Sequence, residues 1–393
     1  MTETRPTEAA DTGRRSPEIP FNRPYATGAE FDYIREAIAN SHLSGNGPFT
    51  RRCTELLERE LGSARVLLTH SCTGALEMAA LLADVGPGDE VIVPSFAFPS
   101  LANAVALRGA TPVFVDIRAD TLNLDERLVE GAITPRSKAI APIDYAGVGC
   151  ELTTLLEIAC GHELVLIEDA AQGYRASYRD RPIGSLADVA CLSFHETKNV
   201  MCGEGGALLV NRPEWVERAE VIQEKGTNRS AFFRGQVDKY TWVDVGSSYV
   251  VSDINAAFLW AQFEQAREIT DARMKIWEAY HAGLEQLESA ERIRRPVVPG
   301  ECAHNAHMYY VLLGLGADRD RFIASLASAG VNAVFHYVPL HSSPAGRSLG
   351  RVHGSLDVTD DVSERLVRLP LWVGMDGSTI DQVLSAVSAA LDA

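Results

Sequence analysis

The sequence lacks the features of a membrane or exported protein. Its 393 residues contain no run of 18 apolar residues, about the length that a helix needs to cross a bilayer. The first 20 residues are polar, include three arginines and have no apolar centre, so they do not resemble a signal peptide. We therefore expect a cytoplasmic protein with no membrane partner, in which residues 1–18 form a disordered tail.

Paired cysteines and an excess of basic residues are also missing. The seven cysteines form no C-x-x-C pair, and their odd number suits reduced thiols better than a disulfide framework. Acidic residues outnumber basic ones by 53 to 36, which gives a formal net charge of −17. Since nucleic-acid-binding proteins usually carry a basic face, we expect no nucleic-acid partner. A local basic pocket for one nucleotide diphosphate stays compatible with this charge.

What the sequence does contain is an alternation of short apolar runs and helical patterns. The runs are typical of buried strands, and helical patterns of roughly 10–15 residues separate them. This alternation predicts a mostly parallel sheet covered on both faces, with ligands beyond the carboxyl ends of its strands. No G-x-G-x-x-G motif follows the first run, which disfavours a dinucleotide-binding dehydrogenase. The runs are 66–68, 91–93, 112–115, 139–141, 164–167, 189–192 and 207–210.

The flanking parts of the chain read as more helical. Before the first run, helices are expected at 28–40 and at 48–61, where Pro48 suits a first helical position. Beyond Arg212, the pattern predicts one long helix from Ser252 to about Leu287. Further strands are expected at 305–314, 331–339 and 369–371, and further helices at 319–329, 360–368 and 379–391.

Two of the apolar runs end in groups that suit a Schiff-base cofactor. Asp169 closes the run at 164–167, and Lys198 follows Ser193 by five residues and leads into a glycine-rich turn. Pyridoxal phosphate (PLP) needs an amine for its aldehyde, a carboxylate for its pyridine nitrogen and donors for its phosphate. Taken singly, the lysine could be an ordinary surface charge and the aspartate a helix N-cap. Together they favour a PLP site.

On these residues the chain resembles the DegT/StrS-type nucleotide-sugar aminotransferases of PLP fold type I. The resemblance rests on E-D-A-A-Q at 168–172, S-F-H-x-x-K at 193–198 and G-E-G-G at 203–206. It extends from about Ile19 to the C-terminus. It implies an α/β fold with a large PLP-binding domain at 19–260, and a linking helix with a smaller C-terminal α+β domain at 261–393.

The resemblance also implies roles for the residues around the cofactor ring. Lys198 would be the Schiff-base lysine and the proton shuttle, and Asp169 would pair with the pyridinium nitrogen. Gln172 would donate to the phenolic oxygen of the cofactor. The related sugar 3-dehydratases carry a histidine in place of Lys198, so the lysine favours transamination.

A second group of residues is implied for the phosphate and the face of the ring. Thr73 opens a helix after the first run, and free N–H groups at a helix start bind phosphate. The resemblance assigns Cys72 and Thr73 to the phosphate turn, with Ser193 as a third donor. It places Phe98 on the pyridine ring, although a core phenylalanine is the plain alternative.

One departure from the family pattern concerns the contact between subunits. Many members carry an asparagine that reaches the cofactor phosphate of the neighbouring subunit, and here Ser248 stands in its place while Val250 replaces an arginine. We expect a homodimer or larger homo-oligomer, with this reach passing to Ser248 or to another polar group.

The segment around this departure is similar to transaminases that act on dTDP-4-keto-6-deoxyglucose. Residues 224–242 and 246–249 carry that similarity. Its cations and tryptophan suit a diphosphate and a thymine ring, although a solvated basic loop is the alternative. The histidines of the C-terminal half have no acidic partner at metal-ligand spacing, so we expect no metal. The expected substrate-binding residues are Lys225, Asn228, Arg229, Trp242, His336, Tyr337 and His341.

The resemblance implies a ping-pong aminotransferase. Glutamate would convert bound PLP to pyridoxamine phosphate, and the amino group would pass to C4 of dTDP-4-keto-6-deoxy-D-glucose. The product would be a dTDP-4-amino-4,6-dideoxyhexose of gluco or galacto configuration. Two alternatives stay open: an aminotransferase for another keto nucleotide sugar, at C3 or linked to UDP or GDP, and a non-catalytic PLP-binding regulatory protein.

Overall fold

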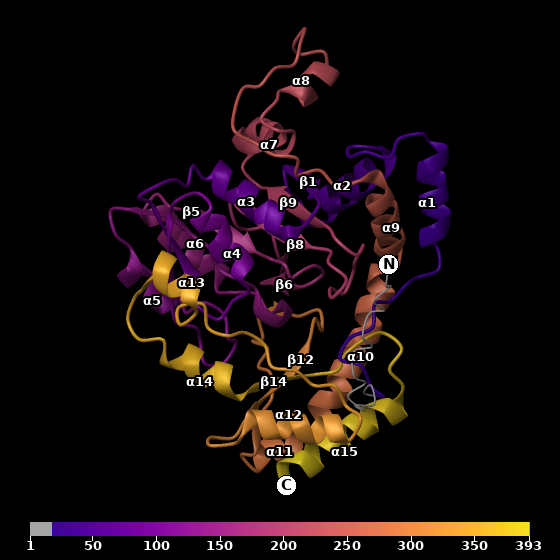
Figure 1. Ribbon diagram of the computed structural model, residues 1–393, viewed down its shortest axis with the longest axis vertical. Coiled ribbons are helices and arrows are strands. Elements are labelled where there is room, and N and C mark those ends of the chain that lie inside the picture. Colours follow the sequence, from indigo (N-terminus) through magenta and orange to yellow (C-terminus); the bar gives the residue numbers. More distant parts are fainter. Residues whose placement is uncertain (1–17, 393) are drawn as a thin grey trace, which may run out of the picture.

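One eight-stranded sheet organises the part of the chain described by the computed structural model, residues 18–392 (Figure 1). Its strand order is β1-β9-β8-β5-β4-β2-β3-β13; β9 is antiparallel to both neighbours, and the other paired strands are parallel. The seven predicted runs lie in this sheet, so the prediction of a mostly parallel sheet is confirmed. The strands are β1 Arg65–Thr69, β2 Glu90–Pro94, β3 Thr111–Val115, β4 Ser137–Ile140, β5 Val165–Asp169, β8 Val189–Ser193, β9 Gly206–Val210 and β13 Arg351–Val352.

Helices cover both faces of this sheet because its strands are apolar on both sides. Neighbouring strand residues join opposite cores: Val66 and Leu68 pack with one set of helices, and Leu67 packs with the other. The first set is α2 Pro48–Leu61, α5 Glu126–Ala132, α6 Leu152–Gly161 and α9 Asp253–Glu264; the second is α3 Cys72–Leu82, α4 Pro99–Ala106 and α7 Val216–Gln223.

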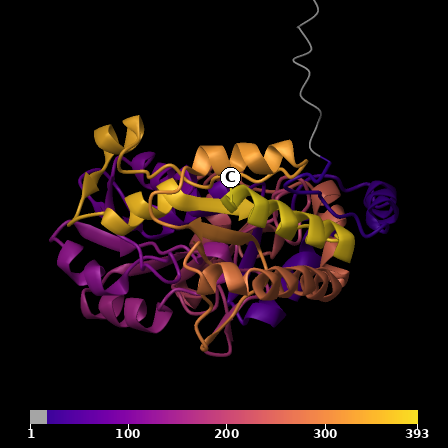
Figure 2. The same cartoon turned by 90° about the horizontal axis from the view of Figure 1, so that it is seen from below.

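A third core belongs mainly to the C-terminal part of the chain. There an antiparallel sheet of β10 Ile293–Arg294, β12 Tyr309–Leu313 and β14 Leu366–Leu369 packs with helices. Figure 2 shows two of these helices, α12 and α15, side by side. The domain boundary at 260/261 stays a prediction. The helices are α10 Ala266–Gly283, α11 Glu285–Ser289, α12 Arg319–Ser328 and α15 Gly377–Asp392. Helix α14 Asp357–Arg365 also contacts β12, but its buried Val362 belongs to a separate core with Tyr310.

The predicted tail at 1–18 lies outside the described residues apart from Glu18. None of the helices within residues 18–392 is long and apolar enough to span a bilayer. The remaining elements are α1 Glu30–Ala39, α8 Arg229–Phe233, α13 Pro344–Leu349, β6 Ser177–Tyr178, β7 Arg181–Pro182, β11 Cys302–Ala303 and the 3-10 turns Tyr145–Gly147 and Pro213–Trp215.

Several predictions of local structure were wrong in part. The strands predicted at 305–314 and 369–371 are shorter or shifted, since β12 covers only Tyr309–Leu313 and β14 ends at Leu369. The long helix from Ser252 is broken into α9, α10 and α11, because Gln265 at φ −115° and Leu284 at φ −97° leave the helical conformation. The helix predicted to end at Arg368 ends at Arg365, since pairing with β12 draws Arg368 into strand β14. The strand predicted at 331–339 forms only isolated bridges, so tertiary pairing decided these boundaries.

Candidate active site

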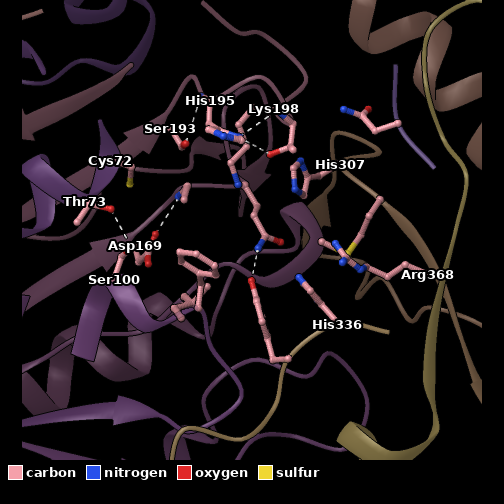
Figure 3. Close-up of a pocket in the computed structure, with 18 of the residues that line it drawn as sticks. Cys72, Thr73, Ser100, Asp169, Ser193, His195, Lys198, His307, His336 and Arg368 are labelled. Carbon is pink, nitrogen blue, oxygen red and sulfur yellow. Dashed lines mark hydrogen bonds between the residues drawn. The ribbon is translucent and has the colours of Figure 1, made fainter. Parts of the chain in front are cut away.

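A cavity of about 470 Å³ opens beyond the carboxyl ends of β1, β5 and β8 (Figure 3). Strand ends of the large sheet form one wall, and α10, β14 and the segments beside β14 form the other. The structure brings many of the predicted residues together on these walls, while the roles assigned to them stay predictions. The predicted residues that line the cavity are Cys72, Thr73, Phe98, Asp169, Gln172, Ser193, Lys198, His336 and Tyr337.

Lys198 lies in a tightly tied loop after β8. Its backbone N–H donates to the His195 carbonyl at 2.9 Å, and Phe194 on the same loop donates to Gly205 at 2.9 Å. Within residues 18–392, the amine of Lys198 has no hydrogen bond or ion pair. Burial lowers its pKa from the ordinary value, and the nearby Asp169 carboxylate only partly opposes this effect. This shift favours the neutral, nucleophilic form of the amine over its charged form.

Asp169 supplies a buried carboxylate at the end of β5. The backbone at this residue is held on both sides, since its N–H donates to Pro142 and its carbonyl accepts from Asp144. The side chain accepts one hydrogen bond, from the Ala171 N–H at 3.1 Å. Burial raises its pKa to about 6, with Ala171 and Lys198 acting in the opposite direction. A cation placed against it would relieve this cost.

Two helix starts meet at the other end of the cavity. Ser71 caps α3 by accepting from the Gly74 N–H at 3.1 Å, and Cys72 and Thr73 occupy the first turn, where N–H groups have no intrahelical partner. The Thr73 hydroxyl contacts the Ser100 hydroxyl, in the first turn of α4, at 2.7 Å. These groups form a polar cradle suited to a phosphate.

Gly206 lets strand β9 approach this cradle closely. A Cβ at this position would lie 2.4 Å from the backbone nitrogen of Cys72 and 2.5 Å from the carbonyl carbon of Ser71. Only glycine fits without displacing backbone atoms. The glycine-rich turn of the sequence therefore shapes the phosphate end of the cavity.

The residues present fit PLP. An unpartnered amine, a buried carboxylate that needs a cation, and a helix start with hydroxyls line one cavity, in keeping with the aldehyde, pyridine nitrogen and phosphate of the cofactor. Lys198 and Asp169 would hold the reactive end and the ring nitrogen. Thr73, Ser100 and Ser193 would hold the phosphate.

The predicted sugar-binding residues divide into two groups. Tyr337 lines the cavity and accepts from Gln172 Nε2 at 3.1 Å, while the Gln172 Oε1 accepts from a backbone N–H. His336 lines it too, with its Nδ1 2.7 Å from the hydroxyl of Tyr145. His341 instead lies against Ser95, with Nδ1 2.8 Å from Oγ, and is not part of the cavity wall.

The residues predicted from segment 224–248 lie outside the cavity of this chain. They sit on or beside an arm that carries α8 and projects from the sheet (Figure 1). Trp242 is 75% exposed, and Arg229 and Lys225 lie near Glu224 at 3.7 and 4.0 Å. The Asn228 side chain accepts from a backbone N–H of the same arm, and Ser248 bridges to Glu224 through its backbone. The reach of Ser248 to a neighbouring subunit stays a prediction.

Among the residues of the cavity wall that the sequence interpretation missed are four with polar or charged side chains suited to bind a ligand. Ser100 follows Pro99 at the start of a helix, which is a usable signal for a first-turn donor. Arg273 sits among the buried positions of α10, where a charge is unusual. His307 was noted only within a histidine cluster. Arg368 was assigned to a helix end, whereas the structure places it in β14 with its side chain on the cavity.

Comparisons with known proteins agree with this geometry. The model of the DegT/DnrJ/EryC1/StrS aminotransferase family matches residues 24–388. GDP-perosamine synthase of Caulobacter vibrioides is 33% identical, covering 95% of this chain and 99% of that protein. The crystal structure of the aminotransferase TlmJ from Streptoalloteichus hindustanus superposes with a TM-score of 0.87 at 30% identity, covering 95% and 99% of the two chains. Streptococcus pneumoniae Spr1654, solved in PLP and PMP forms, superposes with a TM-score of 0.87 at 26% identity, covering 95% and 98%.

Proposed function

The chain belongs to the DegT/DnrJ/EryC1/StrS aminotransferase family, and on that premise we propose that it transfers an amino group from glutamate to C4 of dTDP-4-keto-6-deoxy-D-glucose. It is a PLP-dependent sugar aminotransferase with the fold of type I PLP enzymes. The donor, the nucleotide and the ring position are the proposed part. The product would be a dTDP-4-amino-4,6-dideoxyhexose of gluco or galacto configuration.

The observation that carries the proposal is the unpartnered amine of Lys198 in one cavity with the buried Asp169 carboxylate. PLP, when bound, supplies an electron sink that stabilises negative charge on the carbon losing its proton. In this arrangement the Lys198 Nζ would take that proton from the substrate carbon and deliver it to the cofactor carbon C4′, and its lowered pKa favours the neutral form that accepts a proton. The Asp169 carboxylate would keep the ring nitrogen protonated.

The dTDP-4-keto sugar is supported by two features of the chain. The segment at 224–242 is similar to transaminases acting on that substrate, and it carries the exposed Trp242 and the cations Lys225 and Arg229. His336 and Tyr337 stand at the cavity wall as hydrogen-bonding groups for a sugar. Because these arm residues lie outside the cavity of their own chain, we propose a homodimer in which the arm and Ser248 serve the neighbouring site. A cytoplasmic location is part of the same proposal.

A second candidate is a GDP-linked 4-keto sugar. It is favoured by the 33% identity to GDP-perosamine synthase over nearly the whole chain. The two candidates share the cofactor chemistry at Lys198 and differ in the nucleotide.

Absorption spectroscopy of the purified protein with PLP tests both half-reactions. We expect glutamate to bleach the yellow band of bound PLP and dTDP-4-keto-6-deoxyglucose to restore it. Bleaching without restoration by this sugar would keep the aminotransferase and reject the acceptor, and a GDP-linked keto sugar would then be tried. A preparation that forms no band with PLP would reject the proposed mechanism.

A further inference from the structure

Two arginines on the C-terminal wall of the cavity have no acidic partner among the residues that the structure describes. Arg273 of α10 is 5% exposed, and Arg368 of β14 faces the same space, as Figure 3 shows. Among residues 18–392, no carboxylate forms an ion pair with either guanidinium. Burial lowers the pKa of Arg273 to about 10 and also lowers that of Arg368. Buried charges are normally paired, so these two guanidinium groups favour an anionic ligand at this wall.

Neutral carbonyl groups hold both guanidinium groups in place. Arg273 donates from Nε to the Ala306 carbonyl at 3.1 Å and from Nη2 to the His307 carbonyl at 2.7 Å. Arg368 donates from Nε and Nη2 to the Phe335 carbonyl at 3.3 and 3.0 Å. In the described part of the chain, neither Nη1 has a hydrogen-bond partner. Neutral carbonyl groups therefore orient each guanidinium group and leave its positive charge unneutralised.

The Arg368 guanidinium is fixed from a third side. It lies over the ring of Phe21, 4.8 Å from the ring centre, so a segment far away in sequence restrains it. Such restraint reduces the side-chain entropy lost when a ligand binds, which suits a preformed recognition group.

The electrostatic effect of the two arginines extends to the Lys198 end of the cavity. Arg368 contributes to the lowered pKa of Lys198, and both arginines contribute, after burial, to the lowered pKa of His307. The acids that line the cavity are Asp169 and Glu204, and the first is the proposed partner of the cofactor nitrogen. The cavity wall that carries Arg273 and Arg368 thus has positive charge close to Lys198 that nearby carboxylates do not balance.

We propose that Arg368 and Arg273 bind the two carboxylates of a dicarboxylic amino donor, one each, and so select glutamate. The inference rests on the proposed function, which requires a donor whose amine reaches the Lys198 end of the cavity. A guanidinium binds a carboxylate with paired, charge-assisted hydrogen bonds, and two such groups on one wall match a ligand with two carboxylates. A monocarboxylic donor would leave one buried arginine without a partner.

Glutarate is the probe for the first test, because it has both carboxylates of glutamate and no amine to react. Its dissociation constant is measured by calorimetry with the PLP-loaded enzyme and with Arg368→Gln, Arg273→Gln and the matched control Arg267→Gln. Arg267 lies on the same helix as Arg273, is exposed and pairs with Asp271. We expect each cavity variant to bind glutarate roughly 10–100-fold more weakly and the control to be unchanged. Butyrate, with one carboxylate, should bind more weakly than glutarate to the wild type.

Two further measurements keep the test decisive. Thermal unfolding shows whether each variant is folded. If Arg273→Gln is unfolded, Arg273→Lys takes its place. The lysine keeps the positive charge and should restore part of the glutarate affinity. Thymidine diphosphate is titrated into the same proteins, because a nucleotide phosphate is the other anion that arginines could bind. An unchanged glutarate affinity in folded Arg368→Gln would overturn the inference. So would a loss confined to thymidine diphosphate.

This result is separable from the fate of the proposed function. If glutarate binding depends on the arginines but the dTDP keto sugar fails to restore the PLP band, the donor site stands and the acceptor falls. If the keto sugar reacts with the PMP-loaded enzyme while Arg368→Gln binds glutarate as tightly as the wild type, only the inference about the donor is rejected.

Discussion

Burial acts in opposite directions on the two ionisable groups at the centre of the cavity. It lowers the pKa of the Lys198 amine and raises the pKa of the Asp169 carboxyl to about 6. Both shifts disfavour the charged form of the group. A bound cofactor would therefore stabilise these two side chains better than water does. A protonated pyridine nitrogen would stabilise the Asp169 carboxylate.

Replacing Lys198 with alanine should abolish turnover while leaving the fold intact. The amine has no hydrogen bond in the described structure, and its removal takes away the proton acceptor and donor of the reaction. We expect turnover to fall by at least about 10³-fold. The rate is measured with glutamate and the keto sugar, and circular dichroism reports the fold. Lys275→Ala, at an exposed position of α10, is the control and should keep full activity. Normal turnover in Lys198→Ala would disprove the proposed role.

Asp169→Asn should stabilise the cofactor-free protein above pH 6 although it weakens cofactor binding. The folded pKa of about 6 lies above the ordinary value of 3.8, so ionising the buried group destabilises the fold at pH 8. As the pH falls through 6 the carboxyl takes up a proton in the folded state first, and this destabilisation disappears by about pH 4. The asparagine should therefore add about 2–3 kcal/mol to the free energy of unfolding at pH 8 and almost nothing at pH 4.

Urea unfolding of both cofactor-free proteins at the two pH values provides the measurement. Asp271→Asn, at an exposed site of α10, should show no such pH dependence. A difference that grows toward pH 4 would contradict the assigned direction of the pKa shift.

At the scale of elements, the site depends on how closely a strand approaches a helix start. Strand β9 is antiparallel to β1 and β8, and Gly206 pairs with Thr69 on one side and Ser193 on the other. This places Gly206 directly against the start of α3. The reversed strand thus joins the lysine loop to the phosphate cradle.

Gly206→Ala should damage the phosphate end of the site. The added Cβ would meet backbone atoms of Ser71 and Cys72, so the helix start must move. We expect a loss of about 1–3 kcal/mol in stability, and a loss of cofactor affinity on the order of tenfold or more because the cradle is misplaced. Denaturant unfolding and a PLP titration measure the two effects. Gly161→Ala, in α6 with open space around its Cβ, is the control and should be neutral or slightly stabilising.

At the scale of the whole molecule, the projecting arm exposes a group of apolar side chains that is unusual on the surface of a monomer. Phe233 is 69% exposed and Trp242 is 75% exposed, and Tyr240, Val243 and Val245 are exposed beside them. Such a patch is typical of an interface. It is consistent with the proposed homodimer, in which the arm meets a second copy of the chain.

The double variant Phe233→Ser with Trp242→Ser should weaken this dimer. Large aromatic anchors contribute most of the affinity at interfaces, so we expect the dissociation constant to rise by roughly 10–100-fold. Sedimentation equilibrium measures the change. Leu315→Ser is the control, since Leu315 is 86% exposed on the C-terminal part of the chain. A monomeric wild type, or a double variant that associates as the wild type does, would refute the proposal.

Local patterns in the sequence determined the sheet, most of its covering helices and the placement of an acid and a lysine in one site. Buried strands of a parallel sheet are apolar throughout, so the runs at 66–68, 91–93 and 189–192 could be recognised without tertiary information. Asp169 and Lys198 could be placed together because the carboxyl ends of such strands share one edge. The motifs around them were sufficient for the family and the cofactor.

Tertiary structure alone decided the other wall of the cavity. Arg368 looked like a helix end until pairing with β12 made it part of a strand, and Arg273 looked like one more charge on a long helix. Whether a charged side chain is buried, and whether an acid reaches it, depends on contacts between residues far apart in the sequence. Local periodicity carries no information about those contacts. The sequence by itself therefore determined the cofactor half of the site, and only the packing of the C-terminal elements decided the half where we propose that the amino donor binds.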